Sequence, residues 1–421
     1  MELKYSELGL RQKGSNIDQL MADALRDPGM LSLAAGFTDN STLPLAEVKA
    51  IVGELEESTM VGRSALQYGT NQGSPRLRNL LTRRIEVFDG VAENSYSEDG
   101  MFITNGSQQG LYLAMQTLCN PGDIVLVEEP TYFVFLEILR GLGIEALPTP
   151  MLDSGEIDTP ELKSLLGNLS ESGDLERVKA LYLVSYFANP TGHSIEFNTK
   201  CALGHILRET APHIAIIEDA AYRDLYFGEP FDGGSVLSGD AFDGLSVLYS
   251  STLTKPFATG LKLGYSLCSN SDWLARMLAV KSQQDFGSAN FPQVIMEKML
   301  EFGHFDKHLV TIRESYREKM EVLNTSIQPL KDLGWSWHTS LGGLYLWLKA
   351  PIDVSTQFGS DFHKQCNAAQ VMYVPGSLCY AKNSQLDGVR LSYGVLELDK
   401  LTEAGRRFLS AAISLKEINL V

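Results

Sequence analysis

The sequence predicts an α/β protein, with a mainly parallel β-sheet in a large domain and a smaller α+β domain after it. Between residues 100 and 300, short apolar segments typical of buried strands alternate with segments typical of helices. This alternation implies parallel strands covered by helices on both faces. After about residue 300 the alternation ends, and a long helix of mixed charge precedes short strands and helices. We expect an N-terminal arm that also forms part of the small domain (1–44), a large domain (45–300) and a small C-terminal domain (301–421).

The individual elements follow from apolar periodicity and turn residues. Before the main sheet we expect a short amphipathic helix over 15–26, a strand over 31–36, and helices over 45–57 and 75–88, the last with Pro75 in its first turn. Six apolar runs predict strands of the main sheet, at 101–104, 124–127, 144–147, 179–185, 214–217 and 245–249. Helices are expected between them at 107–118, 131–141, 196–210 and 271–284. In the small domain we expect helices over 305–329 and 356–369, a turn over 371–376 and an apolar segment over 388–393.

Composition argues against several classes of protein. The net charge of −17 argues against binding to nucleic acid or to an anionic membrane. No apolar run approaches the roughly 20 residues that span a bilayer, and the N-terminal residues lack the basic and apolar regions of a secretory signal. The five cysteines are scattered without C-x-x-C spacing. We therefore expect unpaired thiols in a reducing cytoplasm and no metal site.

One lysine stands out at the end of a predicted strand. An apolar run leads into Ser251, Thr252, Thr254 and Lys255, and a second cation, Lys262, follows seven positions after Lys255. Burial and a neighbouring cation both disfavour the ammonium form, so the pKa of such a lysine falls and its amine can attack a carbonyl to give a Schiff base. The hydroxyl groups and the second cation are also groups that surround a bound phosphate. Taken alone, the segment also fits an ordinary polar loop.

Polar residues follow other predicted strands, and ligands of open parallel sheets bind at the carboxyl ends of the strands. Ser107 and Gln108 open a helix whose free N–H groups suit a phosphate, although such turns often only cap helices. Tyr132 either stacks on a planar ring or is a half-buried tyrosine without a chemical role. Asn189 begins a turn. Asp219 either caps a helix or pairs with a buried ligand cation, because a buried carboxylate needs a partner.

In their order along the chain, these residues resemble the fold-type I pyridoxal-phosphate (PLP) aminotransferases of classes I and II, and among them the branch of 2-aminoadipate and aromatic aminotransferases. The resemblance covers nearly the whole chain, from 31–36 to 390–393. Its motifs are Tyr68, the turn of Gly106, Ser107 and Gln108, Tyr132, Asn189-Pro190-Thr191-Gly192, Asp219 with Tyr222, Lys255, Lys262 and Arg390. It implies a mainly parallel seven-stranded sheet, a PLP-binding large domain and a homodimer with shared active sites.

The resemblance gives catalytic roles to Lys255, Asp219 and Tyr222. Lys255 would hold PLP covalently and, once freed by the substrate, carry a proton as general acid and base. Asp219 would pair with the protonated ring nitrogen and keep the ring an electron sink. Tyr222 and Asn189 would bind the phenolic oxygen of the ring, and Tyr132 would stack on the ring face.

The resemblance also implies contacts to the phosphate and to the substrate. The phosphate would be held by Ser107, Gln108, Thr252 and Lys262, and from the neighbouring subunit by Tyr68. Arg390 would clamp the α-carboxylate of the substrate with two parallel hydrogen bonds, a geometry that lysine cannot copy, and Asn189 would lie beside it. Gly36 would let the small domain close over the substrate.

Three residues depart from the family pattern. Lys262 stands where arginine is usual, so the charge is kept and the two-pronged geometry is lost, and Thr254 stands where serine is common. Asp18 occupies a position at which relatives that act on long acidic substrates tend to have arginine, and an anion there would repel a distal carboxylate. We therefore expect a neutral or aromatic amino acid and a 2-oxo acid such as 2-oxoglutarate as substrates. The nearby Arg11 keeps 2-aminoadipate open.

Two alternatives to an aminotransferase stay open. Lyases, decarboxylases and racemases use PLP on the same fold, and Arg390 favours α-carboxylate substrates without excluding them. The ligand-sensing domain of a transcription regulator also has this fold. Such regulators place a basic helix-turn-helix domain before it, whereas here the fold begins within about 30 residues and the chain is acidic.

Overall fold

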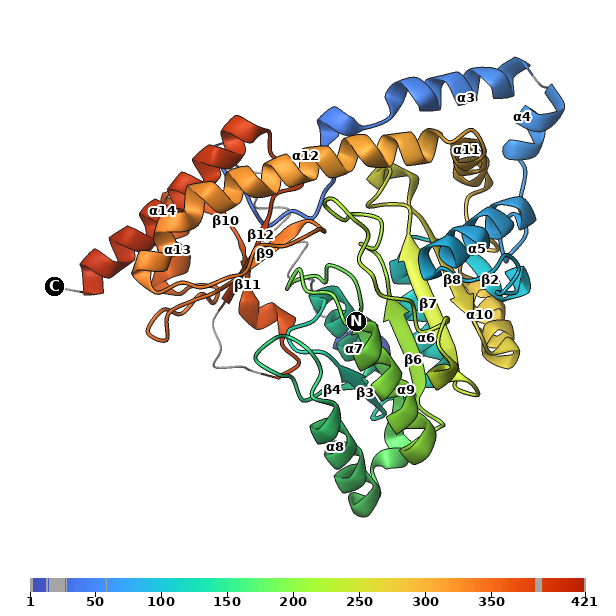
Figure 1. Cartoon of the computed structure of the whole chain (residues 1–421), viewed down its shortest axis with the longest axis horizontal. Helices are drawn as coiled ribbons and strands as arrows, with labels where there is room; N and C mark the ends of the chain where they lie inside the picture. The colour runs from blue at the N-terminus through green and yellow to red at the C-terminus, as the bar shows by residue number, and fades with distance from the viewer. Residues whose placement is uncertain are drawn as a thin grey trace.

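The protein has a large domain, a small domain and a long helix that runs along both (Figure 1). The computed structural model describes residues 3–12, 14, 27, 29–57, 59–382 and 388–419. The long helix is α12 (His304–Ile327). One face of α12 is buried along its whole length, from Phe305 to Ile327, so it ties the two domains to a common core. The helix expected over 15–26 lies outside the described residues.

A seven-stranded sheet forms the centre of the large domain, as the sequence predicts. Its strands, in order across the sheet, are β2 (Met101–Asn105), β8 (Leu263–Cys268), β7 (Val247–Thr252), β6 (Ala215–Asp219), β5 (Val178–Val184), β3 (Ile124–Val127) and β4 (Glu145–Pro148). Only β8 runs against the others, antiparallel to both β2 and β7. The sequence analysis predicted six of these strands from apolar runs and did not predict β8, which begins directly after Lys262.

Helices cover both faces of this sheet. The helices of the large domain are α3 (Leu45–Glu57), α4 (Thr59–Ala65), α5 (Pro75–Asp89), α6 (Ser107–Leu118), α7 (Phe133–Leu142), α8 (Thr159–Ser172), α9 (Phe197–Thr210), α10 (Ser271–Gln284) and α11 (Asn290–Glu301). Alternate residues of β5 face opposite layers: Tyr182 packs with α6, α7 and α10, whereas Leu181 and Leu183 pack with α8 and α9. This two-sided burial explains why the strands are continuous apolar runs.

The small domain contains two short sheets. An antiparallel sheet has the order β11 (Val374–Pro375), β12 (Gly388–Ser392) and β9 (Tyr345–Lys349), and β1 (Leu31–Ser32) pairs in parallel with β10 (Val371–Met372). Helices α13 (Asp361–Ala368) and α14 (Leu398–Asn419) pack beside them (Figure 1). Helix α13 is shorter than expected at its start, because Gly359 has a φ of +79° and Ser360 then caps the helix by accepting from the backbone N–H of His363.

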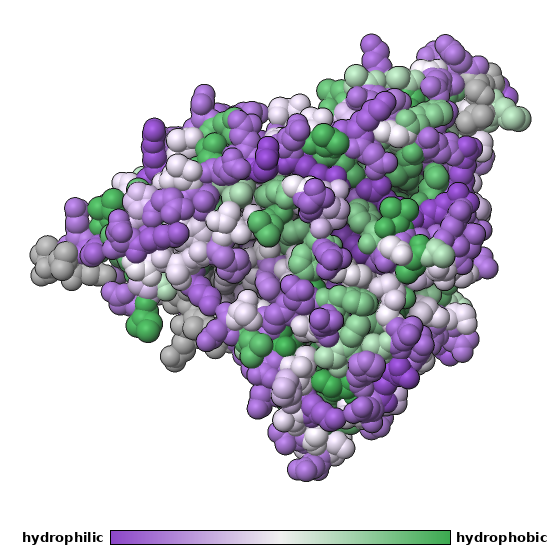
Figure 2. Space-filling model, viewed as in Figure 1, coloured by the Kyte–Doolittle hydropathy of each residue, from purple (hydrophilic) through white to green (hydrophobic). Residues whose placement is uncertain are grey.

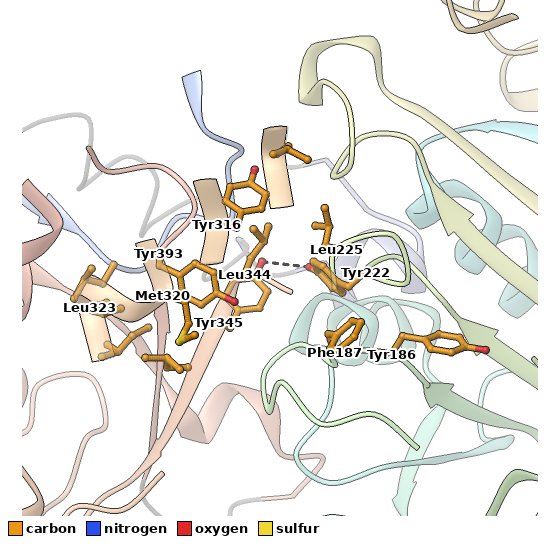
Figure 3. Close-up of a cluster of buried hydrophobic side chains, with 14 of the residues drawn as sticks. Tyr186, Phe187, Tyr222, Leu225, Tyr316, Met320, Leu323, Leu344, Tyr345 and Tyr393 are labelled. Carbon is orange, nitrogen blue, oxygen red and sulfur yellow. Dashed lines mark hydrogen bonds between the residues drawn. The ribbon is translucent and has the colours of Figure 1, made fainter. Parts of the chain in front are cut away.

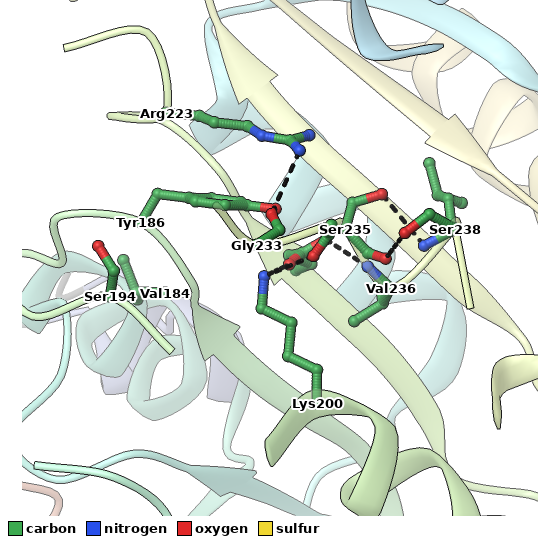
Figure 4. A network of polar contacts seen from close by, with 12 residues as sticks. Val184, Tyr186, Ser194, Lys200, Arg223, Gly233, Ser235, Val236 and Ser238 are labelled. Atoms are coloured by element: carbon green, nitrogen blue, oxygen red, sulfur yellow. Dashed lines mark hydrogen bonds and ion pairs between the residues drawn. The ribbon is translucent and has the colours of Figure 1, made fainter. Parts of the chain in front are cut away.

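A buried network of polar contacts joins β6 to α9 and to the segment 233–238 (Figure 4). Lys200 on α9 and Glu218 on β6 are both fully buried, with 2.9 Å between Lys200 Nζ and Glu218 Oε1. Lys200 Nζ also donates to Gly234 O at 3.0 Å, and the backbone N–H of Val236 donates to Glu218 Oε2 at 3.0 Å. Burial lowers the pKa of Lys200, and Glu218 opposes that shift. The pair therefore fixes the strand whose last residue is Asp219.

Replacing Lys200 with methionine should destabilise the fold strongly, because Glu218 would keep a buried charge without its partner. We expect Lys200→Met to lower the free energy of unfolding by about 3–5 kcal/mol in urea titrations. The double variant Lys200→Met/Glu218→Gln, which removes both charges, should lose clearly less. An equal loss in both variants would show that the ion pair does not determine this stability.

The surface seen in Figure 2 is mostly hydrophilic, with hydrophobic residues in small scattered groups. None of the helices in the described ranges has both the length and the apolar composition needed to cross a bilayer. In the same ranges, no three His, Cys, Asp or Glu side chains gather in a way that could hold a metal ion.

Candidate active site

A continuous cavity lies at the carboxyl ends of β5, β6 and β7, where the large domain meets β12 and β9 of the small domain. It has two adjoining parts, which we call the Arg390 cavity and the Asp219 cavity after a residue that lines only one of them. The residues common to both parts are Tyr132, Asn189, Tyr222, Thr254, Lys255 and Lys262. The Arg390 cavity adds Gly36, and the Asp219 cavity adds Ser107, Gln108 and Thr252. Within one chain, all the site residues named from the sequence except Tyr68 therefore line one cavity.

Lys255 follows the end of β7 and lies at the junction of the two parts. Its Nζ donates to Gly36 O at 2.6 Å. Burial is the largest cause that lowers the pKa of Lys255, and the nearby charges of Arg390 and Lys262 lower it further, while Tyr345 opposes them. The side chain therefore presents a neutral amine more readily than an exposed lysine does, which is what a nucleophile and a general base require.

Asp219 closes the far end of the Asp219 cavity at the last position of β6. Tyr182 Oη donates to Asp219 Oδ2 at 2.8 Å, and the backbone N–H of Ala221 donates to Oδ1 at 3.1 Å. Burial raises the pKa of Asp219 to about 6, and the two hydrogen bonds offset only part of this rise. A buried carboxyl of this kind is ready to pair with a cation, and the protonated nitrogen of a pyridine ring would supply one.

Ionised Asp219 should cost the ligand-free protein stability. A folded-state pKa raised above the unfolded value means that the penalty is absent below about pH 4 and grows as pH rises through 6. Asp219→Asn can keep both hydrogen bonds, because its amide can donate to Tyr182 Oη and its oxygen can accept from Ala221. We expect Asp219→Asn to raise the free energy of unfolding at pH 8 by about 1–3 kcal/mol, and by much less at pH 4.5.

This comparison is made by urea unfolding of the ligand-free proteins at both pH values. If the free energy of unfolding rises by the same amount at pH 4.5 and pH 8, the ionisation of Asp219 is not the cause of the gain.

The opposite end of the Asp219 cavity is the N-terminus of α6. Gly106 precedes the helix with a φ of +75° and provides no side-chain cap. The first N–H groups of α6 are those of Ser107 and Gln108, and both residues line the cavity. Gly264 on β8 passes directly beneath this turn, since a Cβ on Gly264 would lie 2.3 Å from Gly106 C. The free N–H groups and the positive end of the helix dipole make this turn suitable for a phosphate.

Hydroxyl groups and a cation complete this end of the cavity. Thr252 Oγ1 donates to Leu263 O at 3.0 Å and accepts from the backbone N–H of Thr254 at 3.0 Å, so its hydroxyl already shapes the loop after β7. Thr254, whose hydroxyl the sequence analysis grouped with those that surround a bound phosphate, lines both parts of the cavity. Ser251 instead points away and donates to Ala220 O at 3.0 Å. Lys262 has a left-handed backbone, with a φ of +53°, and an exposed side chain that lines both cavities.

Arg390 on β12 provides the cation of the Arg390 cavity. Only 2% of this side chain is exposed. Its Nη2 donates to Ala34 O at 2.6 Å and its Nη1 donates to Asn189 Oδ1 at 3.0 Å, while its buried Nε has no hydrogen-bond partner. The guanidinium carbon lies 4.3 Å from the ring centre of Tyr345 and 5.2 Å from that of Phe133. A guanidinium held in this way can bind a carboxylate through two parallel hydrogen bonds.

Tyr345 is a site residue that the sequence analysis did not identify. It lies at the start of β9 and lines the Arg390 cavity, and Figure 3 shows its hydroxyl directed toward Tyr222. Its hydroxyl lies 3.2 Å from Tyr222 Oη. A Cβ on Gly36 would lie 2.7 Å from Tyr345 Oη and 3.8 Å from Lys255 Nζ, so only glycine fits at position 36. A polar side chain at the start of an apolar strand was the available signal.

The other residues named from the sequence are Tyr132, Tyr68, Arg11 and Asp18. Tyr132 precedes α7, is half-buried and lines both cavities. Tyr68 is 81% exposed, and its ring meets the ring of Phe286 edge-on at 5.9 Å, away from the cavity of its own chain. Arg11, at the end of α1 (Glu7–Arg11), donates from Nε to Gly141 O at 3.2 Å near the end of α7 and is absent from the residues that line the cavity. Asp18 lies outside the described residues.

The fold and the site together define the fold-type I class of PLP-dependent aminotransferases. The family model described as aminotransferase class I and II matches residues 28–407. The chain therefore belongs to this family and is an aminotransferase. Sequence analysis placed it in the same family.

Three relatives show the similarity in detail. Aromatic-amino-acid aminotransferase 1 of Thermococcus litoralis is 29% identical over 409 residues, which cover 96% of this chain and 93% of the relative. The crystal structure of Pyrococcus horikoshii kynurenine aminotransferase in complex with PMP is 26% identical, with a TM-score of 0.88 over 98% of this chain and 97% of that chain. The α-aminoadipate aminotransferase of Thermus thermophilus, complexed with N-(5′-phosphopyridoxyl)-L-leucine, is 25% identical, with a TM-score of 0.83 over 98% of each chain. The compounds bound in these two structures imply PLP as the cofactor of the family.

Proposed function

We propose that this aminotransferase uses PLP, held at Lys255, to move the amino group of a neutral or aromatic L-amino acid to a 2-oxo acid such as 2-oxoglutarate. The observation that carries the proposal is the position of Lys255 between Arg390 at one end of the cavity and Asp219 at the other. When bound, PLP supplies an electron sink for chemistry at the α-carbon of an amino acid. The roles below rest on the geometry of the chain's own residues.

Asp219, Tyr222, Asn189 and Tyr132 would hold the ring. Asp219 would keep the ring nitrogen protonated: burial raises its pKa, and no cation of the described residues is among the groups that lower it. Tyr222 and Asn189 lie on the wall between the two cavities and would donate to the phenolic oxygen. Tyr132 would cover one face of the ring. The phosphate would lie against the N-terminus of α6, with Ser107, Gln108, Thr252 and Lys262 around it.

The substrate would lie in the Arg390 cavity. Arg390 would bind the α-carboxylate, with Asn189 beside it. The neutral amine of Lys255 would take the proton from the α-carbon and pass it to C4′ of the cofactor. The remaining wall is formed largely by apolar groups of Ala34, Ala35, Phe37 and Phe133. The cations that line this cavity are Lys255, Lys262 and Arg390, and each has another role. A neutral or aromatic side chain therefore fits better than the distal carboxylate of 2-aminoadipate.

The test is a panel of amino acids added to the PLP-loaded protein. L-Tyrosine, L-phenylalanine or L-leucine should convert the visible absorbance of the cofactor to that of its aminated form, and 2-oxoglutarate should reverse the change. L-2-aminoadipate should react at least about tenfold more slowly, because burying its distal carboxylate without a partner costs more than about 1.4 kcal/mol. Release of ammonia or carbon dioxide in place of reversible conversion would favour the lyase or decarboxylase alternative.

Lys255→Ala provides the control for this panel. The variant should bind PLP without a covalent link and lose at least the 10²–10⁴-fold typical of a general acid–base residue. Borohydride treatment of the wild type, followed by peptide mapping, should place the cofactor on Lys255. A label on Lys262 or Lys281 would contradict the assignment.

We also propose that two chains form a homodimer with shared active sites. The support is Tyr68, whose aromatic ring and that of Phe286 are 81% and 65% exposed and lie together on the surface. Exposed aromatic residues that touch one another are typical of protein interfaces. In the homodimer, the hydroxyl of Tyr68 would reach the phosphate bound by the neighbouring chain.

Shared sites predict that two inactive variants can restore each other. Heterodimers of Tyr68→Ala and Arg390→Ala should contain one site with both defects and one intact site. Activity should then return towards about half that of the wild type per heterodimer, provided that loss of the Tyr68 contact, about 1.5–3 kcal/mol, makes its parent nearly inactive. If subunit exchange is demonstrated and no activity returns, the two residues serve the same site and the shared-site proposal is wrong.

We place the enzyme in the cytoplasm. All five cysteines are free, and burial raises the pKa of Cys119, Cys268 and Cys379, so these thiols stay protonated and unreactive. Free structural thiols of this kind suit a reducing compartment.

A further inference from the structure

We propose that Tyr345 is a positioning residue for the transamination reaction, acting on two site residues at once: its hydroxyl orients the hydrogen bond of Tyr222, and its ring holds the guanidinium of Arg390. The inference rests on the proposed function, because Tyr222 and Arg390 are the residues that would contact the cofactor and the substrate. Tyr345 comes from β9 of the small domain, whereas Tyr222 follows β6 of the large domain. It therefore links the two ends of the site across the domain boundary.

The hydroxyl arrangement determines which way the hydrogen bonds point. Tyr345 Oη and Tyr222 Oη are 3.2 Å apart, and the two rings meet edge-on with centres 5.8 Å apart (Figure 3). Each phenol has a single proton. If Tyr222 donates its proton to the phenolic oxygen of the cofactor, it can only accept from Tyr345. Tyr345 then donates to Tyr222, and this donation makes Tyr222 a stronger donor in turn.

The ring arrangement determines where the guanidinium lies. The centre of the Tyr345 ring is 4.3 Å from the guanidinium carbon of Arg390, well within the range of a cation–π contact. Tyr345 and Arg390 lie on adjacent antiparallel strands, with Tyr345 paired to Ser392 and Arg390 paired to Trp347. The ring therefore supports one face of Arg390, while Ala34 O and Asn189 Oδ1 fix two of its N–H groups.

The charges around Tyr345 support the direction of this hydrogen bond. Burial raises the pKa of Tyr345, but Arg390, Lys255 and the hydrogen bond with Tyr222 together outweigh burial, so its net pKa lies below that of an ordinary tyrosine. Burial and the neighbouring Tyr345 raise the pKa of Tyr222, so Tyr345 is the more acidic phenol of the two and the stronger donor. The titratable groups that face it from the surrounding elements are Arg390, Lys255, Tyr222, Tyr132, Cys379, Tyr316 and Tyr393. None of these groups is a carboxylate that would raise its pKa again.

The experiment separates the hydroxyl from the ring. Tyr345→Phe keeps the ring and removes the hydroxyl, whereas Tyr345→Leu removes both. Tyr373→Phe is the matched control, because Tyr373 is also buried in the small domain and its hydroxyl donates to Thr356 O at 2.8 Å, outside the cavity. The readouts are the pH midpoint of the visible absorbance of the PLP-loaded protein, and kcat and KM for one amino acid and one 2-oxo acid.

Tyr345→Phe should raise the pH midpoint by about 0.4–1 pH unit and lower kcat about 2- to 10-fold, the range set by one neutral hydrogen bond, with KM little changed. The midpoint rises because a weaker donation from Tyr222 leaves more negative charge on the phenolic oxygen, which retains the proton at Lys255 Nζ. Tyr345→Leu should show the same changes and also raise KM for both substrates about 2- to 10-fold through loss of the ring under Arg390. Tyr373→Phe should change neither the midpoint nor KM.

The two variants test the hydroxyl and the ring of Tyr345 separately. If Tyr345→Phe keeps the wild-type midpoint and kcat, or lowers the midpoint, the hydroxyl does not orient Tyr222. If Tyr345→Leu has the KM of Tyr345→Phe, the ring does not hold Arg390. Both results leave a wild type that binds PLP and transaminates, so the proposed function would survive them. A wild type without a PLP absorbance that responds to amino acids would instead overturn the proposed function, and this inference with it.

Discussion

The burial of three charged groups in one cavity is the constraint on which the structure depends. Lys255, Arg390 and Asp219 are each removed from water at the domain boundary, and burial alone favours the uncharged form of the lysine and the carboxyl. Arginine stays charged, so Arg390 is held by a backbone carbonyl, an amide oxygen and two aromatic rings. The hydrogen bonds that Asp219 and Lys255 make within the chain do not offset the effect of burial on their pKa values, so both groups can gain from a ligand of opposite charge, whereas Arg390 is held in its charged form.

Both domains are needed to build this cavity. The ends of β5, β6 and β7 and the start of α6 supply one wall, and β9 and β12 supply the other. Two hydrogen-bonded contacts cross between these walls, from Arg390 to Asn189 and from Tyr345 to Tyr222. The residues after β1 add Ala34 O and Gly36 O at the boundary itself. A shift of either wall would therefore change hydrogen bonds between residues that line the cavity, so the relative position of the two walls and the binding of a ligand are coupled.

The sequence predicted the class of fold and most of the cavity because both depend on local signals. Apolar runs locate parallel strands, and polar residues at their ends meet at one edge of the sheet, so the strand pattern put Asp219 and Lys255 at that edge, whereas only the family resemblance gave them roles at a cofactor. β8 was missed because Gly264 and two polar side chains interrupt its apolar pattern, and because it directly follows the polar segment around Lys255 and Lys262. Tyr345 was missed because periodicity shows that a side chain points inward but does not show whether it meets a core or a cavity. Tyr68 contacts Phe286 on the surface of its own chain, and a role for Tyr68 at a phosphate depends on the proposed second chain.

The antiparallel strand β8 limits the insertions and deletions that the loop before it can accept. Because Thr252 pairs with Gly264 at the base of the β7–β8 hairpin, Lys255 and Lys262 belong to one closed loop whose two ends are hydrogen-bonded together. The length of this loop therefore limits the distance between Lys255 and Lys262, the residues that we propose hold the cofactor and its phosphate. An insertion or deletion within residues 253–262 would alter that distance, whereas the connections on the far side of the sheet can vary in length without reaching it. Divergence among relatives of this chain should accordingly spare the length of this loop even where its residues change.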